Sequence, residues 1–294
     1  MDEKYKGYAD DTVSSVSDAC EESIIRKLEA DAGRILRFMA SNYLVANPQK
    51  TGFLLIRKKK TSTTRSIEIG GKVVEEEECH RILGLTVNNT LSWKDHVIGK
   101  GGLLSAVYQR IGALRRIVHH VPKKCLPNIA TAIISSKIRY GISVYGTVRL
   151  TKDEPLTEEC RKLQIALNDA MRVANGSRRR DRVHIVDLVE LTGMNTLNRM
   201  AAEEMLNLTW QAVHDPNSPL SSSIKKRTNL ADDRVSRSAS RGDLLNEART
   251  SLGQRNFPES AVRVWNSVAL SIRDAPSKYA AKREIARASR NLPL

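Results

Sequence analysis

The sequence predicts an α+β protein in which the sheet-forming residues precede the helical ones. Two observations support this class, and a third describes its core. Short apolar runs separated by turn residues fill about the first ninety of the 294 residues. Helical periodicity of apolar residues takes over after Trp93. Aromatic residues make up only 4% of the chain, so we expect a core built mostly of Leu, Ile, Val and Ala.

The first ordered segment is predicted to be a hairpin followed by a helix. Tyr8-Ala9-Asp10-Asp11 lies within residues 4–17, which fit a strand, a tight turn and a second strand. Residues 18–21 have the form of a capping box and predict the start of a helix. Apolar residues continue at helical spacing over residues 24–39. Asn47-Pro48 is expected to end this helix, because proline disfavours helical geometry in the residue before it.

Further strands are expected before residue 90. Residues 51–56 form one strand-like run, and residues 82–87 form another that Asn88-Asn89 closes. Between them, Ile67 and Ile69 lead into a Gly70-Gly71 turn followed by valines, which is the pattern of a hairpin. Residues 1–95 are therefore predicted to form a first domain of hairpins and one helix.

The rest of the chain is predicted to be helical. Residues 96–214 form a second domain, residues 215–245 a polar linker rich in Ser and Arg, and residues 246–294 a C-terminal helical element around Trp265. The helices of the second domain are expected at residues 103–118, 127–140, 158–174, 185–191 and 196–213. The third of these helices is expected to stop near Gly176.

The charge of the chain favours a polyanionic partner. The formal net charge is +15, and residues 96–152 contain ten Lys and Arg residues but no Asp or Glu. We expect contacts with nucleic-acid phosphates that are independent of sequence and weaken as salt rises. The alternative is a generic basic surface. The cations that we expect to contact nucleic acid are Lys100, Arg110, Arg115, Arg116, Lys123 and Lys124.

Several protein classes are not expected. The sequence has no long uncharged apolar run, so no membrane-spanning helix and no membrane partner are predicted. The first residues are charged and polar, unlike a signal peptide. The four cysteines are scattered without paired spacing. An intracellular setting, in the nucleus or the cytoplasm, is therefore predicted.

The order of motifs resembles one known family. Tyr8-Ala9-Asp10-Asp11 is similar to the metal-binding motif of reverse transcriptases. The series as a whole resembles the reverse transcriptases of non-LTR (LINE-like) retrotransposons, from the catalytic hairpin of the palm through the thumb to the C-terminus. The other pieces are Asn42, Asn47-Pro48, Lys50-Thr51, Arg81-Ile82-Leu83-Gly84-Leu85, residues 91–96, Tyr140-Gly141, Tyr145-Gly146 and Arg263-Val264-Trp265-Asn266, where the Leu-Pro that follows in the family is replaced.

The resemblance implies an RNA-directed DNA polymerase that binds an RNA template and an RNA–DNA or DNA primer–template duplex. It places Asp10 as a direct Mg²⁺ ligand and Asp11 as a weaker contributor, whereas an Asp-Asp turn without metal is the alternative. Lys50 is implied near the pyrophosphate, or is simply solvated. Tyr8 is implied below the primer terminus, or is a core tyrosine. Leu83-Gly84 is implied to present backbone to the primer strand, and a glycine at a strand bulge is compatible with that role.

The resemblance also predicts an incomplete enzyme. The earlier palm strand, which carries a further metal-binding aspartate in this family, has no counterpart ahead of Tyr8. We therefore expect the polymerase motif to work with a missing N-terminal polymerase half, to bind Mg²⁺ poorly without it and to be inactive alone. The alternative function is a non-catalytic nucleic-acid-binding relic or a co-opted thumb module.

Overall fold

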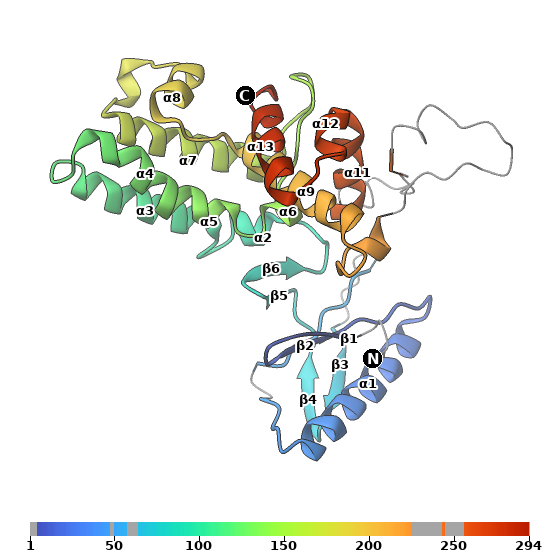
Figure 1. Ribbon diagram of the computed structural model, residues 1–294. Helices are drawn as coiled ribbons and strands as arrows, with labels where there is room; N and C mark the ends of the chain where they lie inside the picture. Colours follow the sequence, from blue (N-terminus) through green and yellow to red (C-terminus); the bar gives the residue numbers. More distant parts are fainter. Residues whose placement is uncertain (1–4, 48–49, 58–63, 225–242, 245–255, 294) are drawn as a thin grey trace, which may run out of the picture. The chain divides into compact units, whose positions relative to one another are not determined.

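The chain forms two compact units, residues 1–96 and 97–294 (Figure 1). The computed structural model describes residues 5–47, 50–57, 64–224, 243–244 and 256–293. Small antiparallel hairpins lie in the first unit and helices make up most of the second, which confirms the predicted α+β class. The boundary between the units lies one residue beyond the predicted division at 95/96.

Three two-stranded antiparallel hairpins form the β-structure of the first unit. They pair β1 (Tyr5–Tyr8) with β2 (Asp11–Ser14), β3 (Ser66–Ile69) with β4 (Lys72–Glu75), and β5 (Cys79–Ile82) with β6 (Leu85–Asn88). The predicted hairpin around Gly70-Gly71 is confirmed. Both glycines have positive φ, 60° and 77°, which is the backbone that a tight two-residue hairpin loop favours.

Two predicted strands differ from the structure. Residues 82–87 are not one strand, because the chain reverses at Leu83-Gly84, where φ is 47° and 82°. The apolar side chain of Leu83 hid this turn in the sequence pattern. Residues 51–56 form no strand either, since Phe53 makes only a single parallel bridge to Glu76.

The long helix α1 (Glu21–Ser41) begins and ends differently from the prediction. Its N-cap is Cys20, which makes no side-chain cap, so the predicted capping box is wrong. Asp18 instead accepts hydrogen bonds from the Ala19 and Cys20 amides. The helix stops well before Asn47, because the next turn reverses at Tyr43, whose φ is 57°.

Apolar packing joins α1 to the β3–β4 hairpin. Phe53, Leu55 and Ile67 are buried, and Ile24 and Leu28 of α1 pack against them. Residues 51–56 therefore supply core side chains to the first unit although they do not form a strand.

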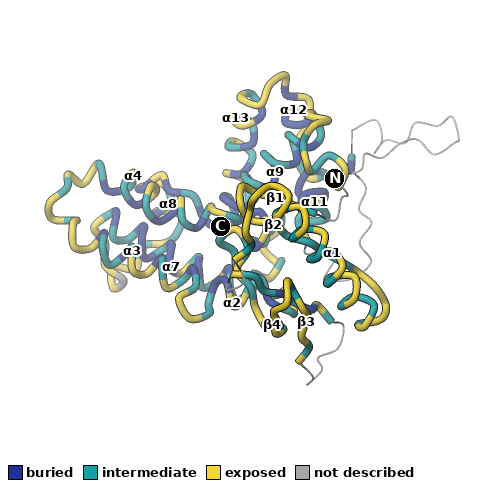
Figure 2. The backbone as a smooth tube through the Cα atoms, turned by 90° about the horizontal axis from the view of Figure 1, so that it is seen from below, coloured by how far each residue is buried: buried dark blue, intermediate teal, exposed yellow. Residues whose placement is uncertain are grey.

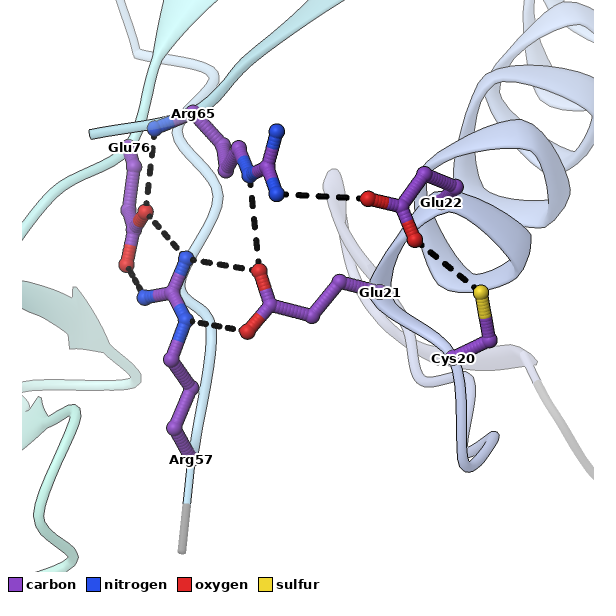
Figure 3. Close-up of polar contacts among 6 residues, drawn as sticks. All are labelled: Cys20, Glu21, Glu22, Arg57, Arg65 and Glu76. Carbon is purple, nitrogen blue, oxygen red and sulfur yellow. Dashed lines mark hydrogen bonds and ion pairs between the residues drawn. The ribbon is translucent and has the colours of Figure 1, made fainter. Parts of the chain in front are cut away.

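An ion-pair cluster also holds the start of α1, and we call it the arginine clasp (Figure 3). Arg57 Nε donates to Glu21 Oε1 at 2.9 Å, and the Arg57 guanidinium also pairs with Glu76 after β4. Arg65 Nε donates to Glu21 Oε2 at 3.4 Å, and Arg65 also pairs with Glu22. The hydrogen bond from Arg57 is the main reason that the pKa of Glu21 lies below its usual value. The clasp therefore ties both ends of the 58–64 connection to α1.

The second unit is helical, as predicted. Gly176 ends α7 (Glu158–Asn175) in the left-handed conformation, with φ 77°, where a helix stop is predicted. The predicted helices at 103–118, 158–174, 185–191 and 196–213 are confirmed within one or two residues, and the helix predicted at 127–140 consists of α4, η2 and α5. The helical elements are α2 (Lys94–Val97, across the unit boundary), α3 (Leu103–Ile117), η1 (Lys123–Cys125), α4 (Leu126–Ala130), the π-helical η2 (Thr131–Ser135), α5 (Ser136–Arg139), α6 (Ile142–Tyr145), α7 (Glu158–Asn175), η3 (Arg179–Asp181), α8 (Ile185–Thr192), α9 (Leu197–His214), η4 (Ser221–Ser223), α11 (Phe257–Ser267), α12 (Leu270–Arg273) and α13 (Lys278–Ser289).

The C-terminal helices belong to the core of the second unit. Both α11 and α13 pack on α9 (Figure 2). Trp265 of α11 is fully buried. The predicted division at 214 therefore does not separate compact units. Most of the predicted linker, residues 225–242 and 245, lies outside the described residues. No helix in the described part of the chain is both long enough and apolar enough to cross a membrane.

Candidate acidic hairpin and nucleic-acid interface

The predicted acidic motif lies at the tip of the β1–β2 hairpin (Figure 1). Tyr8 pairs with Asp11 at the last rung, which leaves Ala9 and Asp10 as a two-residue turn. Ala9 has a φ of 53°, a left-handed backbone that a residue with a side chain adopts only rarely. The expected strand, turn and strand around this motif are confirmed.

The side chains of the motif face solvent. Asp10 and Asp11 are exposed, and neither carboxylate has a hydrogen bond or ion pair to a described residue. One lies in the turn and the other in β2, so their side chains leave the backbone in different directions. Tyr8 is 69% exposed, which overturns the alternative that it is a core tyrosine.

This donor set is incomplete for magnesium. Mg²⁺ takes a near-octahedral shell of oxygens and gives up its waters reluctantly. In the part of the chain that the structure describes, no three His, Cys, Asp or Glu side chains lie close enough together to hold a metal ion. Asp10 and Asp11 alone therefore do not fit the two-metal centre of a polymerase.

One buried acid, which is not among the predicted site residues, contacts β2 of the same hairpin. Asp31 of α1 is 2% exposed. Ser14 Oγ of β2 donates to Asp31 Oδ2 at 3.2 Å, and the Arg34 guanidinium pairs with the other carboxylate oxygen. Burial, the largest influence, raises the pKa of Asp31, but the interactions with Arg34, Tyr5 and Ser14 together bring it below the usual value. Asp31 thus remains charged and ties α1 to β2.

The sequence did contain a signal for this role. Asp31 follows Leu28 by three residues and precedes Ile35 by four, so it falls on the apolar face of the helix. A charged residue on such a face needs a partner inside the fold.

Lys50 lies in the segment that follows α1. It is exposed and forms no ion pair with a described acid. Its backbone amide donates to the Asn47 carbonyl at 3.1 Å, and Thr51 Oγ1 donates to the same oxygen at 2.9 Å. The structure gives this lysine the surroundings of a solvated side chain.

Leu83 and Gly84 form the tip of the β5–β6 hairpin. Leu83 is 44% exposed there, an unusual position for a large apolar side chain in a left-handed turn. The other end of the hairpin is held by Asn88, whose amide donates to Ser92 Oγ at 2.9 Å and Asp95 Oδ2 at 2.7 Å. The hairpin therefore has a fixed base and an exposed apolar tip.

The predicted cations divide into two groups. Five are exposed, and none of the five pairs with an acid among the residues that the structure describes; we call them the exposed cations. They are Lys100, Arg115, Arg116, Lys123 and Lys124.

Arg110 differs from these five cations, because it is half-buried and its guanidinium has a partner inside the second unit. Its guanidinium donates to the Ile133 carbonyl in the π-helical η2 segment. On α3, Arg110 lies seven residues after Leu103 and four before Leu114, so it is on the buried side of the helix.

A small hollow lies between α5, α9 and α13 in the second unit. It has a volume of about 290 Å³, and its lining includes Arg139, Glu204 and Lys282. Arg139 pairs with Glu203 and with Glu204, at 2.9 Å for the second pair. These charges stabilise the packing of α5 on α9, and they account for the polar character of the hollow.

Comparison with known proteins adds no relative. No protein-family model, no curated protein and no solved structure matches the chain. Function is therefore inferred from the residues and the geometry of the chain itself.

Proposed function

We propose that this chain is part of a non-LTR retrotransposon reverse transcriptase, an RNA-directed DNA polymerase, and contributes the palm hairpin and the thumb. The observation that carries the proposal is the Tyr8-Ala9-Asp10-Asp11 motif at the exposed tip of a two-residue hairpin. In a complete site, an acidic tip of this kind would supply carboxylates to the metal ions that bind the reacting phosphate. The carboxylates are available for this only if no cation of the fold pairs with them, and Asp10 and Asp11 have no such partner among the described residues.

The other exposed groups have roles in the same proposal. The exposed cations of the second unit attract nucleic-acid phosphates without reading sequence. Leu83 and Gly84 offer an apolar, closely approachable tip for the primer strand. Tyr8 offers a flat surface beside the acidic pair. The third carboxylate of a complete site has to come from another polymerase segment, which is the expected partner of this chain.

Nucleotide addition tests the first half of the proposal. The purified chain is offered a primed RNA or DNA template, deoxynucleotides and Mg²⁺. We expect binding without extension, because Asp10 and Asp11 do not complete the metal site. Extension by the chain alone would contradict this account of the hairpin.

A salt titration tests the second half. Replacing Arg115 and Arg116 by Ala should weaken the affinity for an RNA–DNA duplex and reduce the slope of log K against log salt by about 2, since each arginine neutralises one phosphate and each phosphate contributes about one unit. The matched control replaces Arg161 of α7 and Arg283 of α13. Both arginines are exposed, but neither belongs to the set that we call the exposed cations. The control should leave the slope of log K against log salt unchanged. Equal slopes for the original chain, the Arg115 and Arg116 variant and the control variant would contradict the proposed phosphate contacts.

A second candidate function is a nucleic-acid-binding module without catalysis. The incomplete set of metal-binding carboxylates favours this function, since phosphate binding by the exposed cations does not depend on a metal.

The two candidate functions differ in how the chain binds a primer end. The polymerase proposal predicts tighter binding to a recessed 3′ end than to a blunt duplex, and loss of that preference on Tyr8→Ala or Leu83→Ala. A simple binding module binds both duplexes equally.

A further inference from the structure

A pair of lysines in the hollow between α5, α9 and α13 is not explained by the packing of these helices. Lys278 and Lys282 of α13 line the hollow, and both are exposed. Neither forms an ion pair with an acid among the described residues, although Glu203 and Glu204 line the same hollow and pair with Arg139. The hollow therefore contains two cations that the described fold does not neutralise.

The direction of the helices keeps these lysines away from the glutamates. Ser289 Oγ of α13 donates to Glu203 Oε1 of α9 at 3.0 Å, and Arg199 Nη2 of α9 donates to the Arg290 carbonyl at 2.8 Å. The C-terminal end of α13 thus lies beside the N-terminal half of α9, so the two helices are antiparallel. Lys282 precedes Ser289 by seven residues, which is about 10 Å along a helix. The glutamates therefore lie at one end of the hollow and the lysines toward the other.

Charge is neutralised at the glutamate end only. Arg139 of α5 pairs with both glutamates, and its Nη1 donates to Glu204 Oε1 at 2.9 Å. Asn195 Nδ2 also donates to Glu203 Oε1, at 2.9 Å. Among the described residues, Glu203 and Glu204 are the acids that line the hollow. The lysine end therefore has a net positive charge.

The stability of α13 does not account for the lysine pair. Lys278 is the first residue of the helix, and Lys282 lies on the same face one turn later. Like charges at this spacing destabilise a helix, and a cation is unfavourable at the N-terminal end, where the helix dipole is positive. The first turn of α13 contains no acid that would compensate. An anionic ligand beside the two lysines would relieve both effects.

The facing wall of α9 offers hydrogen-bond acceptors. Asn207 and Gln211 lie one turn apart and line the hollow. Asn207 Nδ2 donates to the Glu203 carbonyl at 2.8 Å, and Gln211 Nε2 donates to the Asn207 carbonyl at 3.2 Å. Each side-chain amide thus bonds its own helix backbone through nitrogen, and its oxygen has no donor among the described residues. These two oxygens are available to hydroxyl groups of a ligand.

We propose that the hollow binds a small phosphate monoester that carries hydroxyl groups, such as a sugar phosphate. The phosphate lies between Lys278 and Lys282, and the hydroxyl groups donate to Asn207 and Gln211. A phosphate monoester concentrates nearly two negative charges in one tetrahedral group at neutral pH. Lysine binds such a group as a point charge, whereas a planar carboxylate is matched better by the arginine fork.

The size of the hollow agrees with a small ligand. Its volume of about 290 Å³ equals that of about ten water molecules, which is enough for one phosphorylated sugar. This inference goes beyond the function proposed above and does not rest on it.

Titration calorimetry of the full-length chain tests the site with three probes: glucose 6-phosphate, inorganic phosphate and glucose. We expect glucose 6-phosphate to bind at one site per chain, and inorganic phosphate to bind about fivefold more weakly because it lacks the sugar hydroxyls. Glucose should show no binding in the same concentration range. Equal affinities for glucose 6-phosphate and inorganic phosphate would overturn the role of the amide oxygens. Absence of binding by both would overturn the site.

Substitutions on the two walls have different expected effects. Lys278→Gln and Lys282→Gln, each alone, should raise the dissociation constants of both phosphate probes about tenfold. The thermal midpoint should stay the same or rise, because a like charge near the N-terminal end of α13 is removed. Gln211→Leu keeps a good helix former but removes an acceptor. It should weaken glucose 6-phosphate about fivefold and leave inorganic phosphate unchanged.

The matched control is Arg283→Gln. Arg283 is exposed on the same helix and is adjacent to Lys282 in sequence, but it does not line the hollow. Its loss should change either dissociation constant by less than about twofold, because exposed charges outside the site are screened by salt. If Arg283→Gln weakens the probes as much as Lys282→Gln does, the probes respond to net charge and the site is wrong.

Competition distinguishes a small phosphate monoester from the backbone of a nucleic acid, which also carries phosphates. An RNA–DNA hybrid is added to the chain saturated with glucose 6-phosphate, and we expect no displacement. Displacement by the hybrid, together with weaker hybrid binding by Lys282→Gln, would assign these lysines to a nucleic-acid surface and overturn the proposal.

Discussion

The aspartates at the β1–β2 hairpin are of two kinds, exposed and buried. Asp10 and Asp11 are exposed at its tip and have no partner among the described side chains. Asp31 is buried and accepts hydrogen bonds from Ser14 and Arg34. The same residue type is therefore available to a ligand in one place and committed to the fold in the other.

Replacing Asp31 by Asn tests this division. The substitution keeps the shape but removes the charge that Arg34 and Ser14 bond, so we expect the free energy of unfolding at neutral pH to fall by about 2 kcal/mol. Urea unfolding followed by circular dichroism measures it. Asp10→Asn is the exposed control and should change the free energy by less than about 0.5 kcal/mol.

The pH dependence of Asp31 gives a second measurement. Its pKa in the folded chain lies below the ordinary 3.8, so its contribution is complete above pH 3.8 and disappears as the pH falls from there through the lower folded-state pKa. The Asn variant has no such contribution to lose. Its unfolding free energy should therefore fall less steeply on acidification than that of the original chain. Identical acid profiles would contradict the role assigned to Asp31.

At the scale of elements, the π-helical segment η2 provides a backbone carbonyl that binds the side chain of Arg110. The helix formed by α4, η2 and α5 contains the π turn Thr131–Ser135, where hydrogen-bond spacing is wider than in an α-helix. Arg110 of α3 donates to the Ile133 carbonyl within that turn. The arginine thus joins two helices of the second unit.

Arg110→Met is the corresponding prediction. Methionine has a similar helix propensity and length but cannot donate, so the Ile133 carbonyl loses its charged partner. We expect a loss of about 1.5 to 3 kcal/mol in unfolding free energy. The salt slope of nucleic-acid binding should stay the same, in contrast to the Arg115 and Arg116 substitutions. A reduced slope of log K against log salt for Arg110→Met would show that Arg110 also contacts a phosphate.

Local signals explain which elements could be predicted from the sequence. Gly70-Gly71 and Gly176 were predicted as a turn and a helix stop because glycine adopts positive φ without strain. Leu83 and Tyr43 adopt positive φ as well, but apolar and aromatic residues rarely do so, and the sequence pattern therefore does not predict a turn at either. For this reason the prediction misses the β5–β6 turn at Leu83 and places the end of α1 too late.

In the candidate site, too, only local features can be predicted from the sequence. The acidic hairpin and the exposed cations can be predicted, because residue type and spacing define them. The partner of Arg110 was not visible, since Ile133 lies 23 residues away and meets it only after two helices pack.

For the whole molecule, the two units carry complementary chemistry. The first unit presents an acidic tip and an apolar tip, at Asp10-Asp11 and Leu83-Gly84. The second presents the exposed cations on and around α3. A chain with a net charge of +15 gains affinity for any polyanion, so charge alone does not establish a polymerase. The polymerase proposal therefore depends on a contact between the acidic tip and a primer end, which remains to be measured.

Photo-crosslinking from the primer terminus tests that relation most directly. The full chain is mixed with an RNA template and a primer whose 3′-terminal nucleotide is photoreactive, and the adducts are mapped by mass spectrometry. We expect adducts at Tyr8 and at Leu83 or Gly84, and their loss when the reactive nucleotide is moved to the middle of the duplex. Adducts confined to residues 97–294, or the same adducts from both positions, would contradict the proposal that the acidic hairpin addresses a primer end.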